Sequence, residues 1–221
     1  MVEAKIVAAN TQRCWRAVHK AAPRADRMVS ASHGLALAAI MKPIKTIGHS
    51  NHPIEHFVGL LEAAGVALLV DVRSMPYSRR YPQFGKERLA KSLAAAGIGY
   101  VHEGAALGDK PEGGGDYDAL AARPAFQDAL GRLIERAEST TLCLMCAEKE
   151  PLDCHRTALV SRRLAERGVP VDHLLADGGT RPHRDVEETL LAKNAGPDLF
   201  EDRAARLARA WQARERAMKR S

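Results

Sequence analysis

The sequence predicts an α/β fold, in the form of a single three-layer αβα domain around a mostly parallel sheet of about five strands. Three observations predict it. Short apolar runs alternate with segments of helical periodicity, which is the order of strands and crossover helices in a parallel sheet. The runs are apolar throughout, as expected of strands that are buried on both faces. Glycines follow three of the helical segments and mark where they end.

The first half of the domain is expected to hold three strands and two helices. Ile44–Gly48 is a short apolar strand, and Pro53–Ala64 is a helix because its apolar residues recur three and four positions apart. Val66–Val72 is a continuous apolar run and is therefore a buried strand. The second helix is expected at Lys86–Ala96, and a strand at Ile98–Val101 follows it.

The second half continues the alternation after a glycine-rich loop, which is expected over Gly104–Asp118. Pro124–Glu138 is an amphipathic helix with proline in its first turn, where a missing backbone donor is harmless. Thr141–Cys146 is the fourth strand, and Cys154–Arg167 is the helix that follows it. Val169–Leu175 is the fifth strand.

Both ends of the chain are basic. Residues 1–40 carry six lysines and arginines against two acidic residues, and residues 201–221 carry seven against three. Residues 41–200 hold 20 basic and 22 acidic residues, so the body has no excess of positive charge. We therefore expect a basic N-terminal extension outside the core over 1–40, the α/β domain over 41–185, and a basic tail, helical from Glu187, over 186–221.

The composition indicates a cytoplasmic protein. No run of about 18 apolar residues is present, so no membrane-spanning helix is expected. The first residues lack the pattern of a secretory signal. The four cysteines, two of them within one expected strand, do not resemble a disulfide framework.

Reactive side chains follow each expected strand, at the edge of the sheet where a parallel fold places its ligand crevice. The candidates for catalysis are Cys146, Glu148, Cys154 and His155. The candidates for substrate binding are His49, Ser50, Asn51, Asp71, Arg73, Tyr77, Ser78, Arg79, His102, Glu103 and Arg156. Guanidinium groups match carboxylates and phosphates, which predicts a small anionic or nucleotide-like ligand. The alternative is that these arginines only form ion pairs with neighbouring acidic residues.

Two cysteines compete for the role of reactive thiol. Asp153 is expected to cap a helix whose first turn contains Cys154, and a helix N-terminus lowers the pKa of a thiol. The alternative is a structural cysteine packed under a loop. Cys146, at the end of a strand, is either a nucleophile or a small buried apolar residue.

A transition metal is a further alternative, although we expect no cofactor. Cys146, Cys154 and His155, with Glu148 or His49, are ligand types that suit zinc or iron. Their spacing matches no common zinc motif, and adjacent residues such as Cys154 and His155 do not readily face one ion.

Several ordered motifs over residues 44–177 resemble the family called domain of unknown function DUF488. The matching residues are Thr46-Ile-Gly-His-Ser-Asn51, Asp71-Val-Arg-Ser74, Pro76, Ser78-Arg79, Gly97-Ile-Gly-Tyr100, Leu107-Gly108, Cys146-Ala-Glu148 and Cys154-His-Arg156. The resemblance implies a compact α/β domain and no particular reaction. At the level of fold the chain is also similar to rhodanese-like domains, but two acidic residues follow Cys146 where those domains place a ring of amides.

Three functions remain open from the sequence. The first is a cytoplasmic enzyme that uses a thiol on an anionic ligand. The second is a nucleic-acid-binding accessory protein that uses the basic ends. The third is a metal or redox sensor that uses Cys146, Cys154 and His155.

Overall fold

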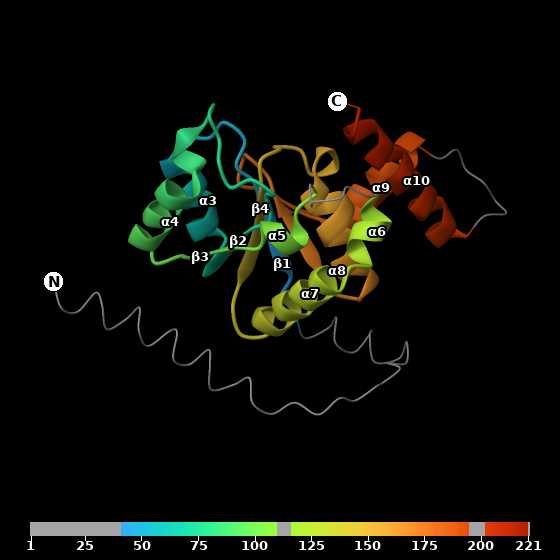
Figure 1. Cartoon of the computed structure of the whole chain (residues 1–221), viewed down its shortest axis with the longest axis horizontal. Helices are drawn as coiled ribbons and strands as arrows, with labels where there is room; N and C mark the ends of the chain where they lie inside the picture. The colour runs from blue at the N-terminus through green and yellow to red at the C-terminus, as the bar shows by residue number, and fades with distance from the viewer. Residues whose placement is uncertain (1–40, 110–115, 195–201, 221) are drawn as a thin grey trace. The chain divides into compact units, whose positions relative to one another are not determined.

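The computed structural model describes residues 41–109, 116–194 and 202–220, and all of them belong to one compact unit (Figure 1). They form a mostly parallel sheet with helices on both faces, which confirms the expected α/β class. The expected extension over residues 1–40, including Cys14, lies outside the described residues. Within the described ranges, no helix has the length and apolar character needed to cross a membrane.

The sheet has six strands in the order β3–β2–β4–β1–β5–β6. Five of them run parallel, and only the last pair, β5 and β6, is antiparallel. The strands are β1 (Ile44–Gly48), β2 (Leu68–Asp71), β3 (Gly99–His102), β4 (Leu142–Cys146), β5 (Val171–Leu174) and β6 (Thr180–Pro182). Leu144 lies opposite Thr46 on one side and Val70 on the other, so β4 is central.

Alternate residues of β4 point to two separate apolar cores, as the two-residue period of a strand requires. Cys143 and Met145 join the core that contains α3 (Ile54–Ala63) and α4 (Lys86–Ala95). Leu142, Leu144 and Cys146 join the opposite core. That core includes α7 (Pro124–Ala137), the π-helix η4 (Arg156–Ser161), α8 (Arg162–Glu166), α9 (His183–Asn194) and α10 (Arg203–Met218).

Three expectations about the elements need correction. The sheet has six strands, because the three-residue strand β6 is too short and too polar to show a strand pattern. The segment expected as a loop over Gly104–Asp118 contains α5 (Gly104–Leu107) and the start of α6 (Tyr117–Ala121). The Asp116 side chain accepts a hydrogen bond from the Ala119 amide and so caps α6. The helix expected from Glu187 begins earlier, as α9.

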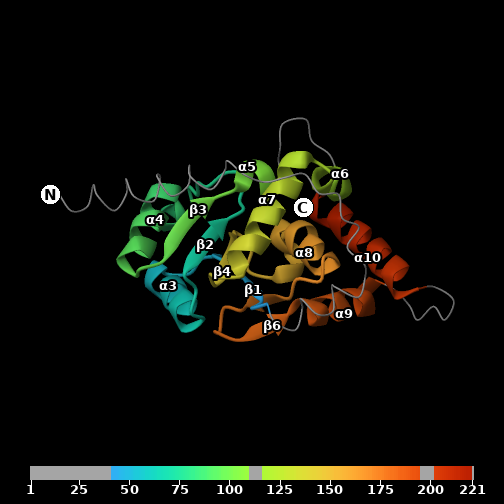
Figure 2. The same cartoon turned by 90° about the horizontal axis from the view of Figure 1, so that it is seen from below.

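Helix α10 and most of α9 lie in the segment expected as a basic tail, and one face of α10 belongs to the core. Trp211 is only 1% exposed and stacks on His183 at a ring separation of 6.0 Å. Glu215, on the next turns, is also buried and accepts a hydrogen bond from the Tyr117 amide at 2.9 Å. Helices α9 and α10 lie side by side (Figures 1 and 2). The arginines between these positions kept the apolar face from standing out in the sequence.

The topology places a crevice above β1 and β4. After β1 the chain enters α3 on one face of the sheet, whereas after β4 it enters η4 on the other. Because the two strands are neighbours, their continuations diverge and leave a hollow at their carboxyl ends. Residues that follow β1, β2 and β4 can therefore meet there.

Two buried histidines link β5 to α9. His173 Nδ1 lies 2.7 Å from the Thr46 hydroxyl, and His173 Nε2 lies 3.0 Å from His183 Nδ1. Burial lowers the pKa of His173 well below its usual value and lowers that of His183 to about 4. Both rings are therefore neutral in the folded protein near pH 7.

We expect the thermal stability to fall as the pH is lowered from about 6.5 to about 4. In this window the unfolded chain binds a proton at His183 and the folded chain does not, so unfolding is favoured. Protonation at His183 alone lowers the free energy of unfolding by about 3 kcal/mol across this window. Each kcal/mol corresponds to roughly 2–4 °C in Tm for a protein of this size. Tm measured against pH checks the slope.

The matched variant is His183→Asn, whose amide reaches the position of Nδ1 and does not titrate. It is expected to have a lower Tm than the wild type at pH 7 and a shallower decline between pH 6.5 and 4. A decline as steep as that of the wild type would contradict a neutral buried histidine.

Candidate functional site

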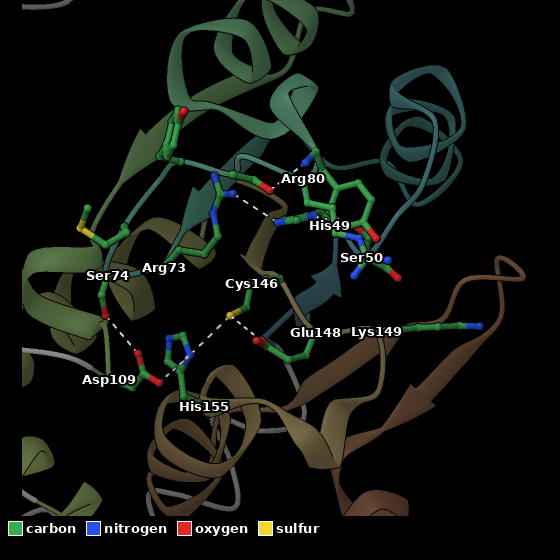
Figure 3. Close-up of a pocket in the computed structure, with 15 residues that line it drawn as sticks. His49, Ser50, Arg73, Ser74, Arg80, Asp109, Cys146, Glu148, Lys149 and His155 are labelled. Carbon is green, nitrogen blue, oxygen red and sulfur yellow. Dashed lines mark hydrogen bonds and ion pairs between the residues drawn. The ribbon is translucent and has the colours of Figure 1, made fainter. Parts of the chain in front are cut away.

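A cavity of about 470 Å³ lies at the carboxyl ends of β1, β2 and β4 (Figure 3). Eight of the residues that the sequence singled out line it, namely His49, Ser50, Arg73, Tyr77, Ser78, Cys146, Glu148 and His155. They come from three different strand ends and from the start of the helix after β4. The topology thus brings together residues that are up to 106 positions apart.

Cys146 is the last residue of β4, and its thiol faces two polar groups. The sulfur lies 3.1 Å from Glu148 Oε2, to which it donates a hydrogen bond, and 3.4 Å from His155 Nδ1. Figure 3 shows the sulfur between the Glu148 carboxylate and the His155 ring. A thiol, a carboxylate and an imidazole are therefore in contact at the wall of the cavity.

The orientation of the His155 ring is set by the backbone that follows β2. Its Nε2 lies 3.0 Å from the carbonyl oxygen of Val72, so Nε2 carries a proton that it donates there. The Nδ1 atom is then the one that faces Cys146, with Asp109 Oδ2 at 3.9 Å on the same side. The ring is 6% exposed, so it reaches the cavity through a small opening.

Cys154 lies behind the cavity wall and caps the helix. Its sulfur lies 3.1 Å from Glu148 Oε2 and accepts a hydrogen bond from the Arg156 amide at 3.4 Å. Its carbonyl accepts the first helical bonds, from Thr157 and Ala158. The expected cap, Asp153, instead pairs with Arg214 of α10. The cap is thus one residue later than predicted, because Pro151–Asp153 forms a separate 3₁₀ turn.

The surroundings of the two thiols push their pKa values apart. Burial alone would raise the pKa of Cys154, but the hydrogen bond from Cys146 and the charges of Arg156 and His155 outweigh it and lower that pKa well below its usual value. Burial, the contact with Cys154 and the charge of Glu148 raise the pKa of Cys146. The surroundings therefore favour deprotonation of Cys154 over deprotonation of Cys146.

The same charges shift the pKa values of the two acid–base groups beside the thiols, His155 and Glu148. Burial alone would lower the pKa of His155, but its contact with the Cys154 anion and the charge of Asp109 raise it to about 9. Burial and the negative charge of Cys154 raise the pKa of Glu148. His155 is therefore an imidazolium at neutral pH, beside a carboxylate that is more basic than usual.

Arg73 is held in place by Asp71 and lines the cavity. Its guanidinium makes two hydrogen bonds to the Asp71 carboxylate, at 2.9 and 2.6 Å, and another to the Phe84 carbonyl at 2.9 Å. Tyr100 donates to the same carboxylate at 2.8 Å. Asp71 is fully buried, so it positions Arg73 and does not itself reach the cavity.

His49 connects Arg73 to β1. Its Nε2 lies 3.2 Å from Arg73 Nη1, and its Nδ1 lies 2.9 Å from the Ser50 carbonyl. Burial lowers the pKa of His49 to about 4, so the ring is neutral and its Nε2 accepts the hydrogen bond from Arg73. Ser50 has a φ of 47°, which is uncommon for a residue other than glycine and is often found at functional sites.

Several sequence candidates do not line the cavity. His102 bonds to the Arg73 carbonyl at 2.8 Å, and Glu103 pairs with Arg132 at 3.3 Å. Asn51 accepts a hydrogen bond from Ser50, and Arg79 is exposed outside the cavity lining. Arg156 is fully buried. It donates to the carbonyls of Glu148 and Lys149, at 2.6 and 3.2 Å, and so holds the loop that carries the cavity residues.

Sequence reasoning gave no role to Asp109, Ser74 or Lys149, which all line the cavity. Asp109 accepts a hydrogen bond from Ser74 at 3.1 Å and faces His155. The only signal for it was the preceding Gly108, where a Cβ would lie 2.4 Å from Ser74 Oγ. A glycine at position 108 indicates close packing of the backbone there. It does not indicate that the next side chain, Asp109, lines the cavity.

Among the described residues, one group has the donors for a metal ion. Ligand atoms of Cys146, Cys154 and His155 all lie within 4.8 Å of one another, so adjacent residues do face one point, contrary to our argument from their spacing. The bond from His155 Nε2 to a backbone carbonyl is also common for metal-binding histidines. Two thiols and an imidazole suit zinc by their chemistry.

Gly48 allows the Glu148 loop to lie against β1, and Gly48→Ala is expected to disrupt the site. A Cβ at this position would lie 1.8 Å from the Glu148 carbonyl oxygen and 3.0 Å from Arg156 Nη1. The loop must then move, at a cost of about 1–3 kcal/mol in the free energy of unfolding. Urea unfolding measures this loss.

The control is Gly59→Ala on helix α3, where a Cβ would meet nothing within 4 Å. Since alanine is the better helix former, this variant is expected to be more stable by roughly 0.5–1 kcal/mol. If Gly48→Ala were as stable as the wild type, the loop would have room for a Cβ at this position, which contradicts the close contact described here.

The family model described as domain of unknown function DUF488 matches residues 53–163, which include Arg73, Cys146, Glu148 and His155 but not His49. No curated protein and no solved structure matches the chain. The family match covers half of the chain and agrees with the motifs read from the sequence, and the chain therefore belongs to the DUF488 family.

Proposed function

We propose that this protein is a thiol-dependent enzyme that acts on a small anionic substrate. The observation that carries the proposal is the position of Cys146 at the cavity, with its sulfur 3.1 Å from a carboxylate and 3.4 Å from an oriented imidazole. A nucleophile in contact with a base, and a second group oriented by the backbone, is the arrangement that thiol enzymes use.

Access favours Cys146 as the nucleophile over the other cysteines. It lines the cavity, whereas Cys143 is fully buried on the opposite face of the sheet and Cys154 lies behind Glu148. Cys146 is also the residue whose thiol points toward both acid–base groups. A substrate that enters the cavity meets this sulfur first.

The neighbours of Cys146 supply the two proton transfers of a substitution at an electrophilic centre. As the Cys146 sulfur forms a bond to that centre, its proton passes to Glu148 Oε2, to which it is already hydrogen bonded. The bond to the leaving group breaks, and the leaving group takes the proton of His155 Nδ1. The hydrogen bond to the Val72 carbonyl keeps the ring oriented while it loses this proton.

Charge in the cavity favours an anion. Arg73, Arg80 and Lys149 line it, together with the His155 imidazolium, against the acidic residues Asp109 and Glu148 and the buried Asp71 that pairs with Arg73. The hydroxyl groups of Ser50, Ser74 and Ser78 add donors for oxygen atoms of a ligand. The guanidinium of Arg80 also lies 5.5 Å from the centre of the Tyr81 ring.

Alkylation with a charged and a neutral reagent tests both parts of the proposal. Iodoacetate and iodoacetamide have similar size but differ in charge, and peptide mapping by mass spectrometry identifies the labelled cysteine. We expect Cys146 to be labelled first. We also expect the ratio of the iodoacetate rate to the iodoacetamide rate to be higher at Cys146 than for free cysteine. Arg80→Gln is expected to reduce that preference about threefold to tenfold, the range of a weakened ion pair.

Cys143→Ser is the matched control, since it removes a thiol that the cavity does not reach. This variant should be labelled like the wild type, whereas Cys146→Ser should lose the fast-reacting site. Cys146 reacting no faster than Cys143, or with no preference for the charged reagent, would count against the proposed function.

A further inference from the structure

Cys146 lines the cavity with 3% of its surface exposed, and the thiol of Cys154 lies next to it. Cys146 Sγ and Cys154 Sγ are each 3.1 Å from the same oxygen, Glu148 Oε2, and they lie within 4.8 Å of one another. Only Cys146 lines the cavity, and Cys154 is 1% exposed. Cys146 is thus placed to react with a substrate in the cavity, and Cys154 is placed to react with Cys146.

We infer that Cys146 and Cys154 form a redox-active pair that reduces small anionic disulfides, with Cys146 as the attacking thiol and Cys154 as the resolving thiol. The inference rests on the proposed function, because it uses the same nucleophile and the same anionic cavity, and it adds the class of substrate.

The first step is a thiol–disulfide exchange at Cys146. Its sulfur forms a bond to one sulfur of the substrate, the substrate S–S bond breaks, and a mixed disulfide remains on Cys146. The proton of Cys146 passes to Glu148, and the departing thiolate takes up a proton from His155. One equivalent of the reduced substrate leaves the cavity.

The second step uses Cys154. Its sulfur attacks Cys146 Sγ, the mixed disulfide bond breaks, and the second half of the substrate leaves as a thiolate, which takes the proton held by Glu148. The protein then carries a Cys146–Cys154 disulfide. The two protein sulfurs have lost two electrons, Cys146 and His155 have each given up one proton, and one disulfide has become two thiols.

The position of Cys154 prepares it for this step. Its sulfur accepts the Arg156 amide at 3.4 Å at the start of the helix, where partial positive charge favours an anion. The buried guanidinium of the same residue lies nearby and has no carboxylate within ion-pair distance among the described residues. A thiolate is favoured there, next to Cys146 and outside the cavity lining.

The geometry also predicts how oxidation changes stability. An S–S bond is about 2.05 Å long, so Cys154 must leave the Arg156 amide to reach Cys146. The disulfide is neutral, so the buried guanidinium loses its anionic neighbour. We therefore expect the oxidised protein to have a lower Tm than the reduced protein, which is the reverse of a structural disulfide.

The test uses the full chain, reduced, freed of reductant and treated with oxidised glutathione, which is an anionic disulfide. Mass spectrometry is expected to show a Cys146–Cys154 disulfide and release of two equivalents of glutathione. Cystamine, a cationic disulfide, is the matched probe and is expected to react at least tenfold more slowly. Cys154→Ser is expected to stop at a glutathione adduct on Cys146, and Cys143→Ser to behave like the wild type.

The outcomes separate this inference from the proposed function. A stable glutathione adduct on Cys146 in the wild type would overturn the resolving role of Cys154 and leave the nucleophile in place. No reaction at either cysteine, together with slow alkylation of Cys146, would overturn both. A stoichiometric metal ion in the purified protein that is lost in both Cys146→Ser and Cys154→Ser would overturn the redox pair in favour of a metal site.

Discussion

The site depends on one buried positive charge, the guanidinium of Arg156. It is fully enclosed and donates to the carbonyls of Glu148 and Lys149, and no carboxylate lies within ion-pair distance of it among the described residues. A charge removed from water in this way needs compensation. The nearby sulfur of Cys154 supplies it, because the guanidinium favours the thiolate over the thiol.

The contacts of Arg156 position the reactive side chains relative to the sheet. Arg156 starts the helix after β4, and its two carbonyl partners belong to the loop between that strand and that helix. The loop lies against Gly48 of β1, where no side chain fits. Glu148 is therefore held beside both thiols, because the hydrogen bonds from Arg156 fix the backbone of its loop. Arg156 itself is absent from the cavity lining, and its contacts position Glu148 and Lys149, which line the cavity.

The sequence was sufficient to predict the α/β class, the five parallel strands and the family, because buried strands and glycine-ended helices have strong local patterns. It was also sufficient to predict that His49, Arg73 and Cys146 gather in one place, since that follows from parallel strands alone. The helix cap on Cys154 was missed because the chain makes a short 3₁₀ turn first, which has no distinct signal. Asp109 and Trp211 were missed because their positions depend on packing between distant segments.

The packing of α10 has a consequence for biosynthesis. This helix fills the core with Trp211 and holds the turn before Cys154 through Arg214, whose guanidinium binds the Leu152 carbonyl at 2.8 Å. All the cavity residues precede it in the chain by more than 40 positions. A ribosome therefore releases every group of the cavity before it releases the segment that completes their support. Until that segment emerges, the core lacks Trp211 and the turn before Cys154 lacks its hydrogen bond from Arg214.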